Sequence, residues 1–236
     1  MRPFILIAAL LAAPATAQTF SPPEGCTLQV TVQNHGCTVE QHLICANDQP
    51  GDMRTVIYGA DGATYISRID RETRWLESYS PVSGISEVLV EGGPVDASFS
   101  RLAQTGRDDF DFWTRIEGGG LLNHVGHDEL SGETATIDGV VLDRTRFHLT
   151  TSDQDGNLLM TREGEQFISR EHGRFYAGTE TITDAEGNVE TFDGTPARFD
   201  FPGDRGFGSI TPEYNCGMQM VRFETYGLGL IYEKGL

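Results

Sequence analysis

Residues 132–201 constrain the fold more than any other part of the chain, because their sequence is that of one antiparallel β-meander. Two loops of the same design interrupt this stretch, at 153–157 and 184–188. Each loop has Asp at its first position and Gly at its fourth, the residues that a type I turn prefers. Thr, Phe, Ile and Val cluster on both sides, as strands require. The sequence therefore predicts a mostly all-β protein built on a large antiparallel sheet.

One strand of this meander, residues 140–152, is long. At ~3.3 Å per residue it would extend about 40 Å. Such a length suits a strand that coils through a large twisted sheet better than a strand of a small sandwich. We therefore predict a half-barrel or an open barrel, formed by a single β-rich domain over residues 18–236.

Shorter strands are predicted upstream of the meander. Apolar residues alternate with polar ones in segments that turn signals separate, which is typical of half-buried strands. The expected elements are two hairpins and two further strands, at 26–45, 53–69, 73–80 and 109–116. Residues 218–232 are compatible either with a final strand or with a docked tail.

Residues 82–105 form the one insertion with helical character. Asp96 is placed to cap a short helix over 97–104, and Gly106 is placed to end it. The segment 85–90 fits either a strand or a helix. We therefore predict a short helical insertion between the early strands and the meander.

The N-terminus has the pattern of a secretory signal peptide over residues 1–17. Arg2 supplies the positive charge, residues 4–13 the apolar run, and Ala15-Thr16-Ala17 the small-residue cleavage site. The apolar run is shorter than the roughly 20 residues that a membrane span needs. This pattern predicts a periplasmic or secreted protein whose mature chain has no integral membrane segment.

The four cysteines predict two disulfide bonds in such an oxidising compartment. If His35-Gly36 is a two-residue hairpin loop, side-chain parity places Cys26 opposite Cys45. Cys37 then pairs with Cys216 and ties the C-terminal part of the chain to the first hairpin. A three-residue loop is the alternative, but it would place Thr38, Glu40 and His42 on the apolar face.

The net charge of −18 restricts the choice of partners. A chain this acidic repels phosphate backbones and anionic membrane surfaces, so a nucleic-acid partner is not expected. An acidic surface keeps an exported protein soluble, and it is also compatible with a cationic partner in the cell envelope.

His124, His127 and Asp128 form the most distinctive cluster of candidate metal ligands. Imidazole and carboxylate groups are ligands that zinc accepts. Residues three apart point to opposite faces of a strand, so a shared metal requires that this segment, which shows little periodicity, forms a loop. A polar loop without a metal is the alternative, and we predict no cofactor.

Other chemical motifs are incomplete. The acidic loop at 153–157 resembles the start of a calcium loop, but Leu158 and Gly164 occupy the positions where an EF-hand needs Gly and Glu. A hairpin turn explains its carboxylates without an ion. Residues 206–210 do not have the order of a nucleophile elbow, and no glycine-rich phosphate loop precedes a helix.

The order of these elements resembles that of the periplasmic lipoprotein-carrier family. An export signal, early hairpins and a short helical block are followed by the long meander. The resemblance implies an unclosed antiparallel half-barrel with a helical lid, and it assigns no functional residues. From the sequence itself we expect residues 82–105 to cover an apolar groove that Val88, Phe99 and Leu102 would line. The chain departs from that family because a cysteine-bearing hairpin replaces the N-terminal helix. A filled β-core without a ligand is the alternative.

Three functions are compatible with the sequence. The first is an exported, non-enzymatic binding or carrier module for a lipid-like or other hydrophobic ligand. The second is a structural or interaction domain that contacts an envelope protein. The third is a metal-dependent hydrolase that uses the His124/His127 segment. The absence of a complete catalytic motif favours a protein that is not an enzyme.

Overall fold

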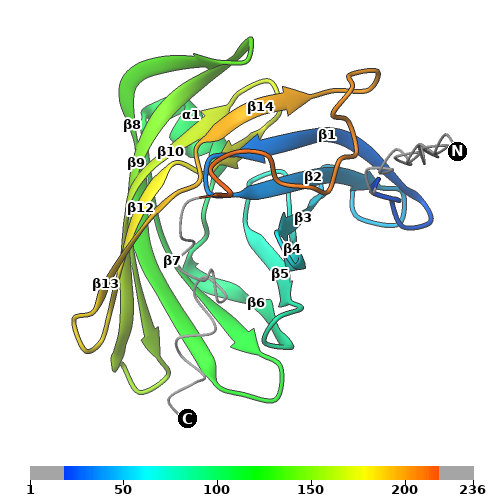
Figure 1. Cartoon of the computed structure of the whole chain (residues 1–236). Coiled ribbons are helices and arrows are strands. Elements are labelled where there is room, and N and C mark those ends of the chain that lie inside the picture. Colours follow the sequence, from blue (N-terminus) through cyan, green and yellow to red (C-terminus); the bar gives the residue numbers. More distant parts are fainter. Residues whose placement is uncertain (1–18, 218–236) are drawn as a thin grey trace, which may run out of the picture.

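A computed structural model describes residues 19–217, which form fourteen strands and one helix. The strands belong to a single antiparallel sheet that is not closed (Figure 1). Its order is β13-β12-β10-β9-β8-β7-β6-β5-β4-β3-β2-β1-β14, and β11 pairs with β10 off this path. The elements are β1 (Cys26–Asn34), β2 (Thr38–Cys45), β3 (Met53–Gly59), β4 (Gly62–Ile69), β5 (Trp75–Ser80), β6 (Ile85–Val95), α1 (Phe99–Thr105), β7 (Arg107–Ile116), β8 (Leu121–Ile137), β9 (Val140–Asp153), β10 (Leu158–Ser169), β11 (Arg174–Tyr176), β12 (Thr179–Asp184), β13 (Val189–Asp193) and β14 (Pro196–Asp200).

The meander and its twin turns are confirmed. Strands β9 to β13 follow one another as antiparallel neighbours, apart from the short β11. In both loops the first Asp accepts backbone hydrogen bonds: Asp153 Oδ1 accepts from the amides of Asp155 and Asn157, at 2.9 and 2.8 Å. Asp184 makes the same pair of contacts in the second loop. The carboxylates thus stabilise the turns, as the sequence predicts.

Two glycines allow the strands of the meander to approach closely. A Cβ atom at Gly126 would lie 2.1 Å from the carbonyl oxygen of His148, and one at Gly164 would lie 2.1 Å from that of Thr179. No real Cβ tolerates such a distance, so only glycine fits at either position.

The insertion at 82–105 is more strand than helix. Its first half is β6, and the helix α1 is shorter than predicted and begins two residues later. The helix N-cap is Ser98 rather than Asp96, because the Ser98 hydroxyl accepts the Arg101 amide hydrogen at 3.2 Å. Gly106 ends the helix in the left-handed conformation, as predicted. Residues 121–130, expected as a loop, are the first half of β8.

Both disulfides are the predicted ones, Cys26–Cys45 and Cys37–Cys216. The predicted two-residue loop is wrong, because the turn has three residues and places Cys37 at a φ of 54°. A register shift between Leu28 and Val30 restores the pairing of Cys26 with Cys45. Between this shift and the turn, Val32 lies opposite Glu40 instead of Val39. The turn therefore places Glu40 and His42 in the protein interior.

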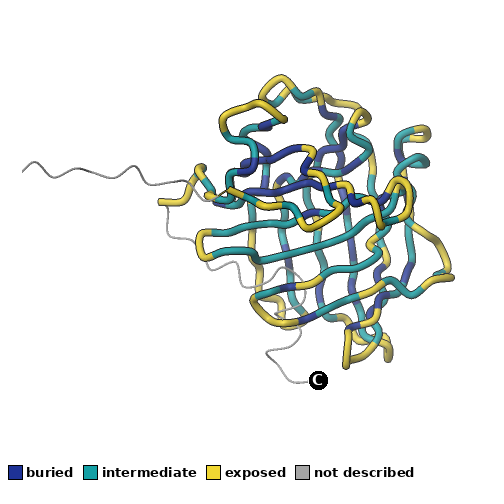
Figure 2. Tube along the Cα trace, turned by 90° about the vertical axis from the view of Figure 1, so that its right-hand side faces the viewer, coloured by how far each residue is buried: buried dark blue, intermediate teal, exposed yellow. Residues whose placement is uncertain are grey.

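The core consists of three clusters of buried residues, and one of them contains Ile85, Ile116, Leu122, Met160 and Ile182 of β6, β7, β8, β10 and β12. Its largest cluster joins β1 and β14 to β9, β10 and β11 through Val30, Val32, Leu142, Phe167, Tyr176 and Phe199. Figure 2 shows buried residues along the strands and exposed residues mainly at the turns. A separate cluster packs Phe20 and Phe207 against β1, β2 and the Cys26–Cys45 disulfide. The predicted signal peptide and the segment 218–232 lie outside the described residues.

Candidate functional site

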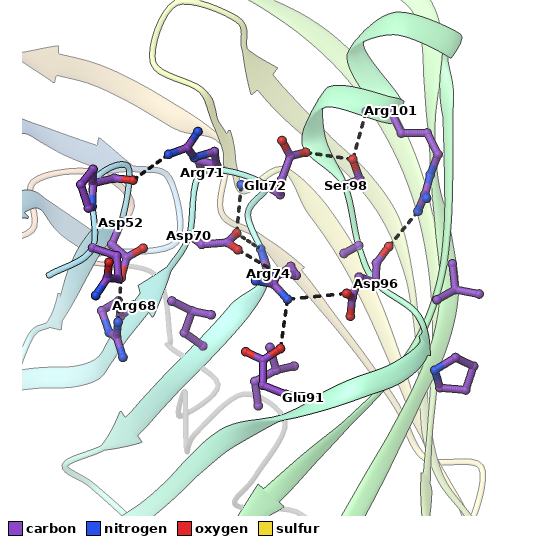
Figure 3. A pocket seen from close by; sticks show the side chains of 17 residues that line it. Asp52, Arg68, Asp70, Arg71, Glu72, Arg74, Glu91, Asp96, Ser98 and Arg101 are labelled. Carbon is purple, nitrogen blue, oxygen red and sulfur yellow. Dashed lines mark hydrogen bonds and ion pairs between the residues drawn. The ribbon is translucent and has the colours of Figure 1, made fainter.

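A pocket of about 1060 Å³, which we call the rim pocket, opens between three chain segments at one end of the consecutive strands β2 to β6. Its walls come from the turn at 49–52, the β4–β5 connection at 70–74 and the chain from Leu89 to Arg101 (Figure 3). Leu76 of β5 and Leu89 of β6 supply apolar surface. The β4–β5 connection and the chain between β6 and α1 therefore position the site.

Ion pairs hold most of the charged groups around the rim pocket. Arg68 Nη1 lies 2.7 Å from Asp52 Oδ2, and Arg74 Nε lies 2.7 Å from Asp70 Oδ2. Arg101 pairs with the buried carboxylate of Asp108. Each of these three guanidinium groups thus has a carboxylate partner, and the pairs give the rim a fixed arrangement of charge.

Glu72 is an ionised carboxylate in the wall of the pocket. Its Oε2 atom accepts hydrogen bonds from the Ser98 hydroxyl at 2.8 Å and from the Ser100 amide and hydroxyl at 3.0 and 2.8 Å. Burial raises the pKa of Glu72, but these hydrogen bonds, together with the nearby charge of Arg71, outweigh burial and lower the pKa overall. They also tie the β4–β5 connection to the start of α1.

Arg71 differs from the other three arginines of the pocket. Among the described residues no carboxylate lies within ion-pairing distance of it, and its Nη2 atom donates to the Pro50 carbonyl oxygen at 3.2 Å. The side chain is exposed. A guanidinium has five N–H donors, so Arg71 keeps donors for a ligand.

His124 is buried in the sheet beside Trp75, which lies at the start of β5 and is itself 41% exposed. The imidazole of His124 stacks on Phe112, with ring centroids 5.1 Å apart. Its Nε2 atom lies 2.8 Å from Thr114 Oγ1, and its Nδ1 atom lies 3.1 Å from Thr151 Oγ1. Glu87 Oε1 is 3.3 Å from Nε2. Both ring nitrogens therefore have partners inside the fold.

The structure does not bring the three predicted metal ligands together. His124 and His127 point to opposite faces of β8, and His127 stacks on His148 of β9. Asp128 lies opposite Asp108, and burial together with the Asp108 charge raises its pKa to about 7. Across residues 19–217, no three His, Cys, Asp or Glu side chains are arranged to hold a metal ion.

The three residues predicted to line an apolar groove do not line the rim pocket. Val88 points away from the side of β6 that Leu89 occupies, and it is 42% exposed. Phe99 packs against Phe175, with ring centroids 6.0 Å apart, and Leu102 is fully buried. The pocket nevertheless borders the same insertion, through its segment 89–101.

The sequence contains one signal for the rim pocket, the mixture of arginine and acidic residues at 68–74 (Arg-Ile-Asp-Arg-Glu-Thr-Arg). Hydrophobic periodicity does not detect it. Hydrophobic periodicity selects residues that pack. The pocket is instead built from turns and from the charged ends of strands.

A second charged group lies inside the core. His42 Nε2 is 2.9 Å from Glu40 Oε2, without the alignment of a hydrogen bond. Arg174 of β11 donates from Nη2 to Thr55 Oγ1 at 2.8 Å. The pKa of His42 is lowered to about 4, chiefly by burial and also by the nearby charge of Arg174. This cluster links β2 and β3 to β11 across the interior.

The two disulfides indicate an oxidising, exported environment. Within residues 19–217, no helix has the length and apolar character needed to cross a membrane. No family model, curated protein or solved structure matches this chain.

Proposed function

We propose that this chain is an exported, non-enzymatic binding or carrier module and that the rim pocket holds its ligand. The ligand class that fits is a lipid-like amphiphile with one anionic head group. Leu76 and Leu89 offer contact to its apolar part, and Arg71 offers hydrogen-bond donors to its head group. The supporting observation is a pocket of about 1060 Å³ in which one exposed guanidinium is not paired with a carboxylate.

The acidic character of the chain is compatible with an anionic ligand. The net charge of −18 repels anions at long range. At physiological ionic strength this repulsion is screened beyond roughly 8 Å. Contact with a guanidinium is a short-range interaction, since charge-assisted hydrogen bonds form within about 3 Å. Local donors therefore decide whether the head group binds.

Two alternative functions have less support. His124 is only 4% exposed and both of its ring nitrogens are engaged, so a substrate does not reach the imidazole that a hydrolase would use as a base. An envelope interaction domain needs no ligand in the rim pocket. Ligand binding therefore distinguishes a carrier from such a domain.

The test is displacement of a fluorescent long-chain fatty acid from the mature chain, read by fluorescence and by native mass spectrometry. We expect a 1:1 complex. The Arg71→Ala variant is expected to bind roughly 10 to 100 times more weakly, because a hydrogen bond to a charged group contributes about 1.5–3 kcal/mol.

Arg115 supplies the matched control. It is exposed on β7 and does not line the rim pocket, so Arg115→Ala removes the same charge at a distance. If both variants bind the fatty acid equally weakly, the effect comes from the overall charge of the chain and not from a contact in the rim pocket. If the wild-type chain binds neither the fatty acid nor its lysophospholipid analogue, the carrier proposal is wrong.

A further inference from the structure

The two disulfides differ in how far they are exposed to solvent. The Cys26–Cys45 bond is packed into a core cluster, in which Cys45 is only 7% exposed. Cys37 is buried as well, at 1% exposure, but its partner Cys216 is exposed. Thiol–disulfide exchange requires access to a sulfur atom, so Cys216 is the most accessible point of attack among the four cysteines.

A pocket of about 320 Å³ opens beside the Cys37–Cys216 bond. Both cysteines line it, together with the β3–β4 turn at 59–62 and the segment 210–212. This pocket gives a thiol group a place to approach the bond from solvent. The Cys26–Cys45 bond does not line it.

Residues 208–216, which we call the strap, lie against β1 and β2. Apart from one isolated bridge at Ser209, the strap contains no strand and no helix. Buried glutamines hold its backbone: Gln41 Nε2 donates to the Ser209 carbonyl oxygen at 2.7 Å, and Gln33 Nε2 donates to that of Thr211 at 3.1 Å. The disulfide fastens the end of the strap to the β1–β2 turn.

The other contacts of the strap lie at the surface. Arg198 Nη1 is 2.6 Å from Oε2 of the exposed Glu213, and Tyr214 packs against His35 and Arg198. Within residues 19–217, none of the three core clusters includes a residue of the strap. Water can replace polar contacts at a small net cost. The disulfide is therefore the strongest tie between the strap and the sheet.

We propose that Cys37–Cys216 is a site of thiol–disulfide exchange with an exported dithiol protein and that its reduction releases the strap from β1 and β2. One thiolate of the reductant attacks Cys216 Sγ, forms a mixed disulfide and expels Cys37 as a thiolate. The second thiol of the reductant attacks the mixed disulfide and releases Cys216. The reductant is oxidised to a disulfide by two electrons, and the two protons that it loses are taken up by Cys37 and Cys216.

Departure of the strap makes the exchange productive. After the first step, the Cys37 thiolate lies next to the mixed disulfide and can attack it, which restores the original bond. When the strap leaves β1 and β2, it carries Cys216 away from Cys37 and opens Cys37 to water. Contacts that hold the strap in place therefore slow the net reduction.

The site of attack is tested with glutathione, a monothiol that stops at the mixed disulfide. The mature chain is treated with glutathione, quenched with iodoacetamide and mapped by peptide mass spectrometry. We expect glutathione on Cys216 and the alkyl group on Cys37. With dithiothreitol, Cys37–Cys216 is expected to be reduced at least ten times faster than Cys26–Cys45. Glutathione attached mainly to Cys37, or equal rates for the two bonds, would overturn the proposal.

Release of the strap is tested by hydrogen exchange. The amides of Gly208 and Glu213 donate to Thr31 Oγ1 at 2.8 Å and to Gln33 Oε1 at 3.0 Å. We expect both amides to lose protection when Cys37–Cys216 is reduced, while the strands keep theirs. If the strap stays protected, or if the whole sheet loses protection with it, release of the strap is wrong.

Glu213→Ala tests whether the strap contacts slow reduction, because it removes the ion pair with Arg198 without touching the core. Dithiothreitol is expected to reduce Cys37–Cys216 roughly two to five times faster in this variant, as the loss of one exposed ion pair predicts. Glu163→Ala is the matched control: it removes an exposed carboxylate on β10, outside the strap, and should reduce at the wild-type rate. Equal acceleration in both variants, or none in Glu213→Ala, would contradict the role of the strap.

Discussion

His42 is a neutral histidine beside a glutamate inside the core, and its environment explains its pKa. Burial is the largest cause of the shift from 6.5 to about 4, and Arg174 contributes in the same direction. Burial raises the pKa of Glu40, but the contact with His42 and the Arg174 charge lower it overall. The group therefore contains a neutral imidazole between a carboxylate and a guanidinium.

This histidine makes the stability of the protein fall on acidification. Between about pH 6.5 and pH 4, the unfolded chain binds a proton at His42 that the folded chain does not, so the free energy of unfolding decreases as the pH falls. From about pH 7.5 to pH 5, the His42 contribution is roughly 2 kcal/mol. Urea unfolding of the wild-type chain and of His42→Gln should differ by this amount in their pH dependence.

The wild-type chain has to be compared with His42→Gln because Asp128 changes the stability with pH in the opposite direction. Its pKa is raised to about 7, so the folded chain holds a proton there between about pH 4 and pH 7 and gains stability as the pH falls. The Asp128 contribution is common to both proteins and cancels in their difference. Parallel pH profiles for the two proteins would contradict the assignment to His42.

At the scale of the elements, the long strands of the meander depend on close backbone approach. Gly126 lies in the middle of β8, where a Cβ atom would meet the carbonyl oxygen of His148. The sequence shows a glycine inside a strand but not which backbone comes near it. Only the pairing of β8 with β9 supplies that information.

The Gly126→Ala variant is therefore expected to lose about 3 kcal/mol or more of stability, because the neighbouring strand has to move. Gly120→Ala is the control, since its added Cβ meets only Gln154, at 4.0 Å, and its backbone φ is not in the left-handed region. Denaturant unfolding will measure both. A Gly126→Ala variant as stable as the control would show that β8 and β9 are not packed this closely.

At the scale of the whole molecule, two disulfides close loops of very different length. Cys26–Cys45 spans 19 residues within one hairpin, whereas Cys37–Cys216 spans 179 and joins the first turn to the C-terminal end of the described chain. The longer loop restricts the unfolded chain more strongly. The Cys37–Cys216 bond therefore holds together the largest part of the fold.

Removing the Cys37–Cys216 bond is expected to cost about 5 kcal/mol in the chain-entropy model, against about 3 kcal/mol for Cys26–Cys45. Paired Cys→Ser variants, compared by thermal and urea unfolding, test this order. If the Cys26/Cys45 variant is the less stable of the two, the packing of Phe20 and Phe207 on that disulfide outweighs the entropy of loop closure.

The sequence by itself determined the parts that depend on local chemistry. The Asp and Gly positions of the twin loops specify turns, and strand periodicity specifies the meander. These signals are contained within a few consecutive residues, so they predict the mostly-β class and the unclosed antiparallel sheet. The number of cysteines predicts two disulfides, but the pairing of Cys26 with Cys45 depends on a register shift that the sequence does not show.

The tertiary structure decided what depends on pairing between distant residues. A three-residue turn and a register shift placed Glu40 and His42 inside, although local parity favours apolar residues there. The rim pocket joins three separate segments, and His127 meets His148 rather than His124. The physical reason is that strand register fixes which side chains are neighbours, and register is set by the whole sheet rather than by any one strand.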